Sequence, residues 1–176
     1  MAEPDPKPGP KLRSELHLVQ LLPNLITISA MCSGLTGIRF AINGQFRAAV
    51  AMILVAAVLD GLDGRIARLL KSESEIGAEL DSLVDFVNFG VAPGLTMYMW
   101  GLQGLQSGGW VATLIYASCC LLRLARFNIG NRSAADKLAD KPAVASFTGV
   151  PSPAGAMLAM LPAYVAFMFP GSGQLH

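Results

Sequence analysis

The chain has 176 residues, of which 53% are hydrophobic and only 14% are charged. Average soluble domains carry about 25% charged residues, so this composition favours a membrane protein. A formal net charge of +1, without a basic segment interleaved with aromatic residues, argues against nucleic-acid binding. The three cysteines all lie in apolar runs and have neither the CxxC nor the Cys/His spacing of a zinc site.

The N-terminal region divides into two parts. Residues 1–11 are rich in proline and charge and are expected to form a disordered tail. Residues 12–22 combine an apolar side with a charged side, which predicts an amphipathic helix lying on the membrane surface. Pro23 is well placed to start the next helix.

Five apolar segments follow, at about 24–43, 46–70, 78–101, 110–129 and 149–169. Each is close to the ~20 residues that a helix needs to cross a bilayer. The predicted fold is therefore all-α, a polytopic transmembrane helix bundle over residues 23–170, followed by a tail or truncation point at 171–176.

Basic residues predict the orientation of the bundle. With the N-terminus in the cytoplasm, 11 of the 13 basic residues lie inside and only Arg39 and Arg47 lie outside. All twelve acidic residues also fall inside. We therefore expect a multi-pass protein of the cell inner membrane, with its polar site at the cytoplasmic face.

Two pairs of aspartates border the second and third apolar segments. Asp60 and Asp63 are three residues apart and Asp81 and Asp85 are four apart, so each pair shares one face of a helix. Residues 71–76 are expected to form the turn between the two helices. The two pairs should then meet across a helical hairpin at the membrane surface, where unpaired carboxylates would be costly.

Four converging carboxylates repel one another unless cations lie between them. Such an all-oxygen site suits Mg²⁺, Mn²⁺ or Ca²⁺ better than Zn²⁺. Gly61, Gly64 and Gly77 would let a nucleotide or phosphate approach the backbone, and Arg68 could pair with a phosphate oxygen. The alternatives are that the glycines serve helix packing and that the aspartates form a solvated interfacial cluster.

The spacing Asp60-x2-Asp63-Gly64-x2-Ala67-Arg68-x8-Gly77-x3-Asp81-x3-Asp85 resembles the motif of the CDP-alcohol phosphotransferase family, with eight typed positions over 26 residues. The resemblance implies cleavage of a CDP-linked donor, transfer of its phosphoryl-lipid part to an alcohol, and release of CMP. It implies one or two Mg²⁺ or Mn²⁺ ions held by Asp60, Asp63 and Asp81, with Asp85 as a ligand or the general base. The resemblance further implies a CDP site lined by Gly64, Ala67, Arg68 and Gly77.

The first apolar segment opens with LPNLIT, at residues 22–27, which is similar to the family's usual entry. Asn24 and Thr27 could contact the cytidine or ribose, or could merely be a polar helix start and cap. The family usually has six core transmembrane helices and often forms homodimers. Five predicted spans leave one helix unaccounted for, while a homodimer remains the expectation.

Two further segments bear on the acceptor alcohol. LRLARFN at 122–128 and FTGVPSPA at 147–154 resemble the phosphatidylserine synthase branch of the family, which implies CDP-diacylglycerol and L-serine as substrates. Arg123 and Arg126 could hold an anionic acceptor, or could anchor the helix by the positive-inside rule. Lys141 and Asn88 are weaker candidates of the same kind, and Asn128 and Ser152 lie at the same level.

Three alternatives remain open. The acceptor could instead be glycerol 3-phosphate or an inositol phosphate, for which a denser basic pocket is expected. A divalent-cation transporter would place its carboxylates nearer the bilayer midplane, on discontinuous helices. A scaffolding protein would leave the carboxylates unexplained.

Overall fold

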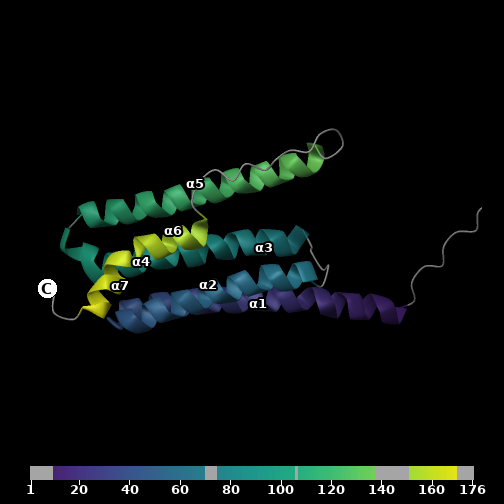
Figure 1. Ribbon diagram of the computed structural model, residues 1–176, viewed down its shortest axis with the longest axis horizontal. Coiled ribbons are helices and arrows are strands. Elements are labelled where there is room, and N and C mark those ends of the chain that lie inside the picture. Colours follow the sequence, from purple (N-terminus) through teal and green to yellow (C-terminus); the bar gives the residue numbers. More distant parts are fainter. Residues whose placement is uncertain (1–9, 70–74, 106, 138–150, 170–176) are drawn as a thin grey trace, which may run out of the picture.

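The computed structural model describes residues 10–69, 75–105, 107–137 and 151–169, with the backbone alone at 10–22, 67–68, 75 and 131–137. All its elements in these ranges are helical, which confirms the predicted all-α class. The long helices run roughly along the long axis of the molecule (Figure 1). The segment 75–105 is central because it contacts helices α1 (Pro10–Ile42), α2 (Phe46–Leu69), α5 (Ser107–Lys137) and α6 (Ser152–Ala159).

Small side chains let α1 and α2 approach closely. Gly37 packs on α2, where an added Cβ would lie 3.1 Å from both the Ala49 carbonyl oxygen and Ile53 Cγ1. The Ser33 hydroxyl donates a hydrogen bond across the interface to the Met52 carbonyl at 2.8 Å. This combination of small residues and interhelical hydrogen bonds is typical of helix pairs in membranes. The reversal between the helices uses Gly44, whose φ of +72° is accessible to glycine without strain.

The helix boundary expected at Pro23 is wrong for the backbone, because α1 continues unbroken from Pro10 to Ile42. A proline inside a helix removes one backbone donor but does not prevent the helix from continuing. Such prolines are tolerated where side chains or neighbours satisfy the freed groups. The surface location of residues 12–22 stays a prediction.

The third helical segment is not a uniform α-helix. It consists of α3 (Glu75–Asp85), a π-helical stretch η1 (Phe86–Val91), α4 (Ala92–Met97), a second π-helical stretch η2 (Tyr98–Leu102) and the 3₁₀ turn η3 (Gln103–Leu105). The π-helical turns are wider than α-helical turns and change the backbone hydrogen-bond pattern. In η1, the Phe89 carbonyl accepts a hydrogen bond from the Tyr116 hydroxyl of α5 at 2.7 Å. Short π-helical stretches often occur at functional sites. This one directly follows Asp85.

One connection and one predicted span differ from the structure. The connection between the predicted segments 78–101 and 110–129 is shorter than expected, since helical structure extends to Leu105 and α5 begins at Ser107. Gly109 permits this tight return because a Cβ there would overlap the Leu102 carbonyl. The segment expected as one span at 149–169 is divided at Met160 into α6 and α7 (Leu161–Met168), where Pro162 supplies no backbone donor.

Within the part of the chain that the structure describes, two helical stretches, Pro23–Ile42 and Ser107–Gly130, are long and apolar enough to cross a membrane. The apolar sequence of α2 is interrupted by charged residues, among them Asp60 and Asp63, although the helix itself is continuous. Large apolar side chains also point out of the described bundle, including Val58 and Leu122, each 62% exposed. An exposed apolar surface of this kind fits contact with lipid. These features fit a membrane-associated protein, while the number of five spans stays a prediction.

Candidate metal and nucleotide site

Asp60 and Asp63 on α2 lie close to Asp81 on α3, and one carboxylate oxygen from each residue lies within 4.8 Å of the others. Asp63 is buried, Asp60 is half-buried and Asp81 is exposed. Oxygens on opposite sides of a single ion are separated by about 4.2 Å for Mg²⁺ and about 5 Å for Ca²⁺. The three carboxylates therefore have the spacing of a divalent-metal site, as the two-pair pattern predicts.

Asp85 completes this group, which we call the Asp cluster (Asp60, Asp63, Asp81 and Asp85). Its carboxyl group lies against that of Asp60, close enough for the two to share a hydrogen bond. Asp85 is one turn further along α3 than Asp81 and directly precedes the π-helical stretch. It therefore lies at the edge of the three-residue metal group.

Two buried carboxylate oxygens of the Asp cluster lack a protein partner in the part of the chain that the structure describes and could accept a cation. The Oδ1 atoms of Asp60 and Asp85 are buried and have no hydrogen-bond partner among the described residues. Buried polar atoms in folded proteins nearly always have a partner, and a buried carboxylate without one is costly. An all-carboxylate donor set fits a hard ion such as Mg²⁺ or Mn²⁺, so the residues present fit the metal that the motif implies.

Asp63 is oriented by two hydrogen bonds. The Thr27 hydroxyl of α1 donates to Asp63 Oδ2 at 2.6 Å, and the Gly64 backbone N–H donates to Asp63 Oδ1 at 2.6 Å. Groups that hold a metal ligand in place are commonly worth 10–100-fold in metal affinity. The structure thus gives Thr27 a role beside the carboxylate, whereas its contact with the nucleotide stays a prediction.

Replacing Thr27 by valine is expected to weaken Mn²⁺ binding by about 10–100-fold, because Asp63 loses the donor that fixes its carboxylate. Thr27→Ser keeps the hydroxyl and should retain most of the affinity. The measurement is a Mn²⁺ titration of the detergent-solubilised chain, followed by the electron paramagnetic resonance of the free ion. Thr36→Val is the matched control, since the hydrogen bond of the Thr36 hydroxyl among the described residues stays within α1, to the Cys32 carbonyl. An unchanged Mn²⁺ affinity in Thr27→Val would contradict this role.

Gly61 and Gly64, beside and within the motif, have open space next to them. At Gly61 and Gly64, no atom of the described residues, apart from the adjoining residues and the local helix backbone, lies within 4 Å of an added Cβ. Close packing on described helices therefore does not account for either glycine, in contrast to Gly37. Gly77 is half-buried on α3, and Asn24 is half-buried on α1, one turn before Thr27. The side chains of Ala67 and Arg68 lie outside the described residues.

Asn88 occupies the interior of the bundle. It is 0% exposed, and neither atom of its amide group has a hydrogen-bond partner among the described residues. The amide faces Gly34 of α1, where an added Cβ would overlap Asn88 Oδ1. Asn88 follows Asp85 by three residues and lies in the π-helical stretch η1. Its contact with an acceptor stays a prediction.

Arg123 of α5 reaches toward both α6 and the Asp cluster. Its guanidinium donates a hydrogen bond to the Ser152 hydroxyl at 2.9 Å and is close enough to Asp85 for an attractive electrostatic interaction. Arg126 is exposed, so these two arginines have different surroundings although they are three residues apart. Asn128 Nδ2 donates to the Ser82 hydroxyl at 2.9 Å, a contact that the sequence did not predict. Lys141 lies outside the described residues.

Comparison with known proteins gives a consistent result over most of the chain. The profile of the CDP-alcohol phosphatidyltransferase family matches residues 20–174. The CDP-diacylglycerol–serine O-phosphatidyltransferase of Mycobacterium tuberculosis is 47% identical over 150 residues, covering 84% of this chain and 50% of the relative. Proteins of the same name from Helicobacter pylori and Bacillus subtilis are 38% and 36% identical, covering 83% and 80% of this chain and 58% and 74% of the relatives.

The chain spans about half the length of the mycobacterial relatives that it matches. Its matched part contains the complete eight-position motif between Asp60 and Asp85 and the helices that bring the aspartates together. By this match and by the identity to its relatives, the chain belongs to the CDP-alcohol phosphatidyltransferase family.

Proposed function

We propose that this chain transfers the phosphatidyl group of CDP-diacylglycerol to the hydroxyl of L-serine, forming phosphatidylserine and releasing CMP. The observation that carries the proposal is the Asp cluster, assembled from the family motif by α2 and α3. The acceptor is inferred from relatives at 36–47% identity that are named for the serine reaction. The donor, CDP-diacylglycerol, is inferred from the names of the same relatives.

The four carboxylates have two roles in this proposal. Asp60, Asp63 and Asp81 hold one or two Mg²⁺ or Mn²⁺ ions, which when bound neutralise charge on the pyrophosphate. Asp85 accepts the proton of the serine hydroxyl. At the same time the hydroxyl oxygen of serine forms a bond to the phosphorus that carries the lipid. The bond between that phosphorus and the oxygen of CMP breaks, and CMP leaves with the electron pair.

The nucleotide is proposed to lie beside α2. Open space at Gly61 and Gly64 supports this placement, because a phosphate or ribose can approach a backbone that carries no side chain. Arg68 would pair with a phosphate oxygen, and Asp63, Ala67, Gly77, Asn24 and Thr27 would complete the site. Thr27 would then serve the site through Asp63, to which it donates a hydrogen bond.

The acceptor is proposed to enter from the α5 side. Arg123 is half-buried, linked to Ser152 and electrostatically coupled to Asp85, so it is well placed to hold the serine carboxylate near the base. Asn88, Arg126 and Lys141 would be further contacts of the acceptor in this proposal. We also propose that the active site faces the cytoplasm at the inner membrane and that the protein is a homodimer.

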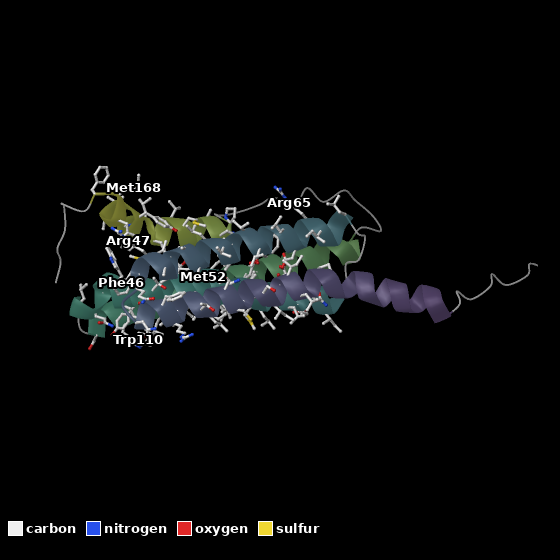
Figure 2. All side chains as sticks on the ribbon, turned by 90° about the horizontal axis from the view of Figure 1, so that it is seen from below. Phe46, Arg47, Met52, Arg65, Trp110 and Met168 are labelled. Atoms are coloured by element: carbon white, nitrogen blue, oxygen red, sulfur yellow. The ribbon has the colours of Figure 1, made fainter. Side chains whose placement is uncertain are left out.

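Replacing Arg123 by glutamine is expected to raise the KM for serine at least ~10-fold, because a hydrogen bond to a charged group is worth about 1.5–3 kcal/mol. The KM for CDP-diacylglycerol should change much less. Arg65→Gln is the matched control, because Arg65 is exposed and points away from the bundle (Figure 2). Equal increases in both Michaelis constants would instead favour an anchoring role for Arg123.

The acceptor assignment is tested by supplying CDP-diacylglycerol with isotopically labelled serine, glycerol 3-phosphate or an inositol phosphate in separate reactions. Label should enter the lipid fraction only with serine. Label from a phosphorylated acceptor, and none from serine, would preserve the reaction class and overturn the proposed acceptor.

A further inference from the structure

The aromatic residues of segment 98–110 and of α7 gather at one end of the bundle. Figure 2 shows Phe46, Arg47, Trp110 and Met168 at this end, with Arg65 toward the other. Tyr98 meets Trp110 edge to face, with ring centroids 5.3 Å apart, and Trp100 meets Phe167 with centroids 6.3 Å apart. We call these four residues, Tyr98, Trp100, Trp110 and Phe167, the aromatic end.

Each of the two candidate membrane-crossing stretches has one of its ends at the level of the aromatic end. Pro23–Ile42 finishes at the turn that leads into Phe46, and Ser107–Gly130 begins three residues before Trp110. Tryptophan and tyrosine are enriched where a membrane-crossing helix passes from hydrocarbon into the headgroup region, because their rings are partly polar. The rings therefore mark the end of the apolar segments independently of the Asp cluster.

The charges at this end favour phosphate groups. Arg39 and Arg47 are both exposed, and the Arg47 guanidinium lies 5.8 Å from the centre of the Phe167 ring. The sequence contains no aspartate or glutamate at 16–59 or 86–135, so the segments that form this end bring no acidic side chain to it. Arginine side chains form strong hydrogen bonds with phosphate oxygens.

We propose that the aromatic end anchors the bundle in the headgroup region of the leaflet opposite the Asp cluster. The four rings lie at the boundary between headgroups and acyl chains, and Arg39 and Arg47 point toward lipid phosphates. The proposal assigns named residues to one membrane–water interface. It rests on the association of the protein with a membrane, and it does not depend on the acceptor or the reaction.

The chain offers a direct probe, because Trp100 and Trp110 are its only two tryptophans. The full chain is reconstituted into phosphatidylcholine–phosphatidylglycerol vesicles whose acyl chains carry bromine either near the glycerol or near the terminal methyl. Tryptophan emission should fall more with the shallow bromines than with the deep ones. Trp100→Phe and Trp110→Phe separate the two signals, and Trp110, which is 43% exposed, should be quenched more than the half-buried Trp100.

Three outcomes would overturn the proposal. Stronger quenching by the deep bromines would place this end inside the hydrocarbon layer. Quenching by aqueous iodide without quenching by either lipid would place it in water. Protection from both kinds of quencher would mean that protein covers it, such as a second copy of the chain. Near-ultraviolet circular dichroism of each variant checks that its packing is retained, and none of these readings depends on enzyme activity.

Discussion

Replacing Asp85 by asparagine is expected to slow CMP release by at least ~10²-fold, while the chain stays folded and still binds the CDP-lipid. A positioned general base typically contributes 10²–10⁴-fold to a reaction rate. Asparagine keeps the size of the side chain and its place beside Asp60, but it cannot accept the proton of the acceptor hydroxyl. The rate is measured by CMP release under saturating serine and metal.

Binding must be followed separately in the Asp85→Asn variant. The increase in Tm on adding CDP-diacylglycerol reports whether the donor site is intact. Glu79→Gln is the matched control, because Glu79 is an exposed carboxylate on the same helix and is not a member of the Asp cluster. Normal turnover by Asp85→Asn would remove the general-base role, whereas loss of both turnover and donor binding would favour a role as a metal ligand.

Replacing Asp60 by alanine is expected to abolish tight Mn²⁺ binding, with a loss larger than that in Thr27→Val. The Asp60 oxygen is one of three that lie within 4.8 Å of one another, and its removal leaves Asp63 and Asp81 without a third protein ligand in this group. Loss of a group that only orients a ligand already costs about 10–100-fold in affinity. Removing the ligand itself should therefore exceed that range.

The Asp60 experiment uses the same Mn²⁺ titration as Thr27→Val and includes Glu79→Gln as a control for the loss of one negative charge. Alanine also relieves carboxylate repulsion in the Asp cluster, so the apo protein should not lose Tm. A normal Mn²⁺ titration curve for Asp60→Ala would contradict its assignment as a ligand. A fall in apo Tm would show instead that Asp60 stabilises the bundle.

The proximity of the aspartates could be predicted because it depends on local spacing. Side chains three or four residues apart share a helix face, and a short connection between two apolar helices makes them neighbours. Asp60, Asp63 and Asp81 meet as this reasoning predicts. The prediction needed only one hairpin and no knowledge of how the other helices pack.

Contacts between distant helices could not be predicted in the same way. Thr27 bonds to Asp63 across 36 residues, and Arg123 bonds to Ser152 across 29. Neither pair leaves a periodic pattern, since each depends on which faces of two helices pack together. Arg123 and Arg126 share a helix face by spacing, yet only Arg123 is half-buried.

Irregular helices were the second class of feature that the sequence did not reveal. Hydropathy identifies an apolar segment but not its hydrogen-bond pattern, so the π-helical turns at 86–91 and 98–102 were missed. Prolines were also ambiguous. Pro23 lies within a continuous helix, whereas Pro162 follows a break at Met160. Their local chemistry is the same, and packing decides which helix continues.

CMP release is the measurement that tests the central claim most directly. The purified, detergent-solubilised chain is given CDP-diacylglycerol and Mn²⁺ or Mg²⁺, with and without L-serine. The account predicts CMP release that requires serine and is abolished by EDTA. Release that is unaffected by EDTA, or that is as fast without serine or any other acceptor, would contradict a metal-dependent transfer to serine at the Asp cluster.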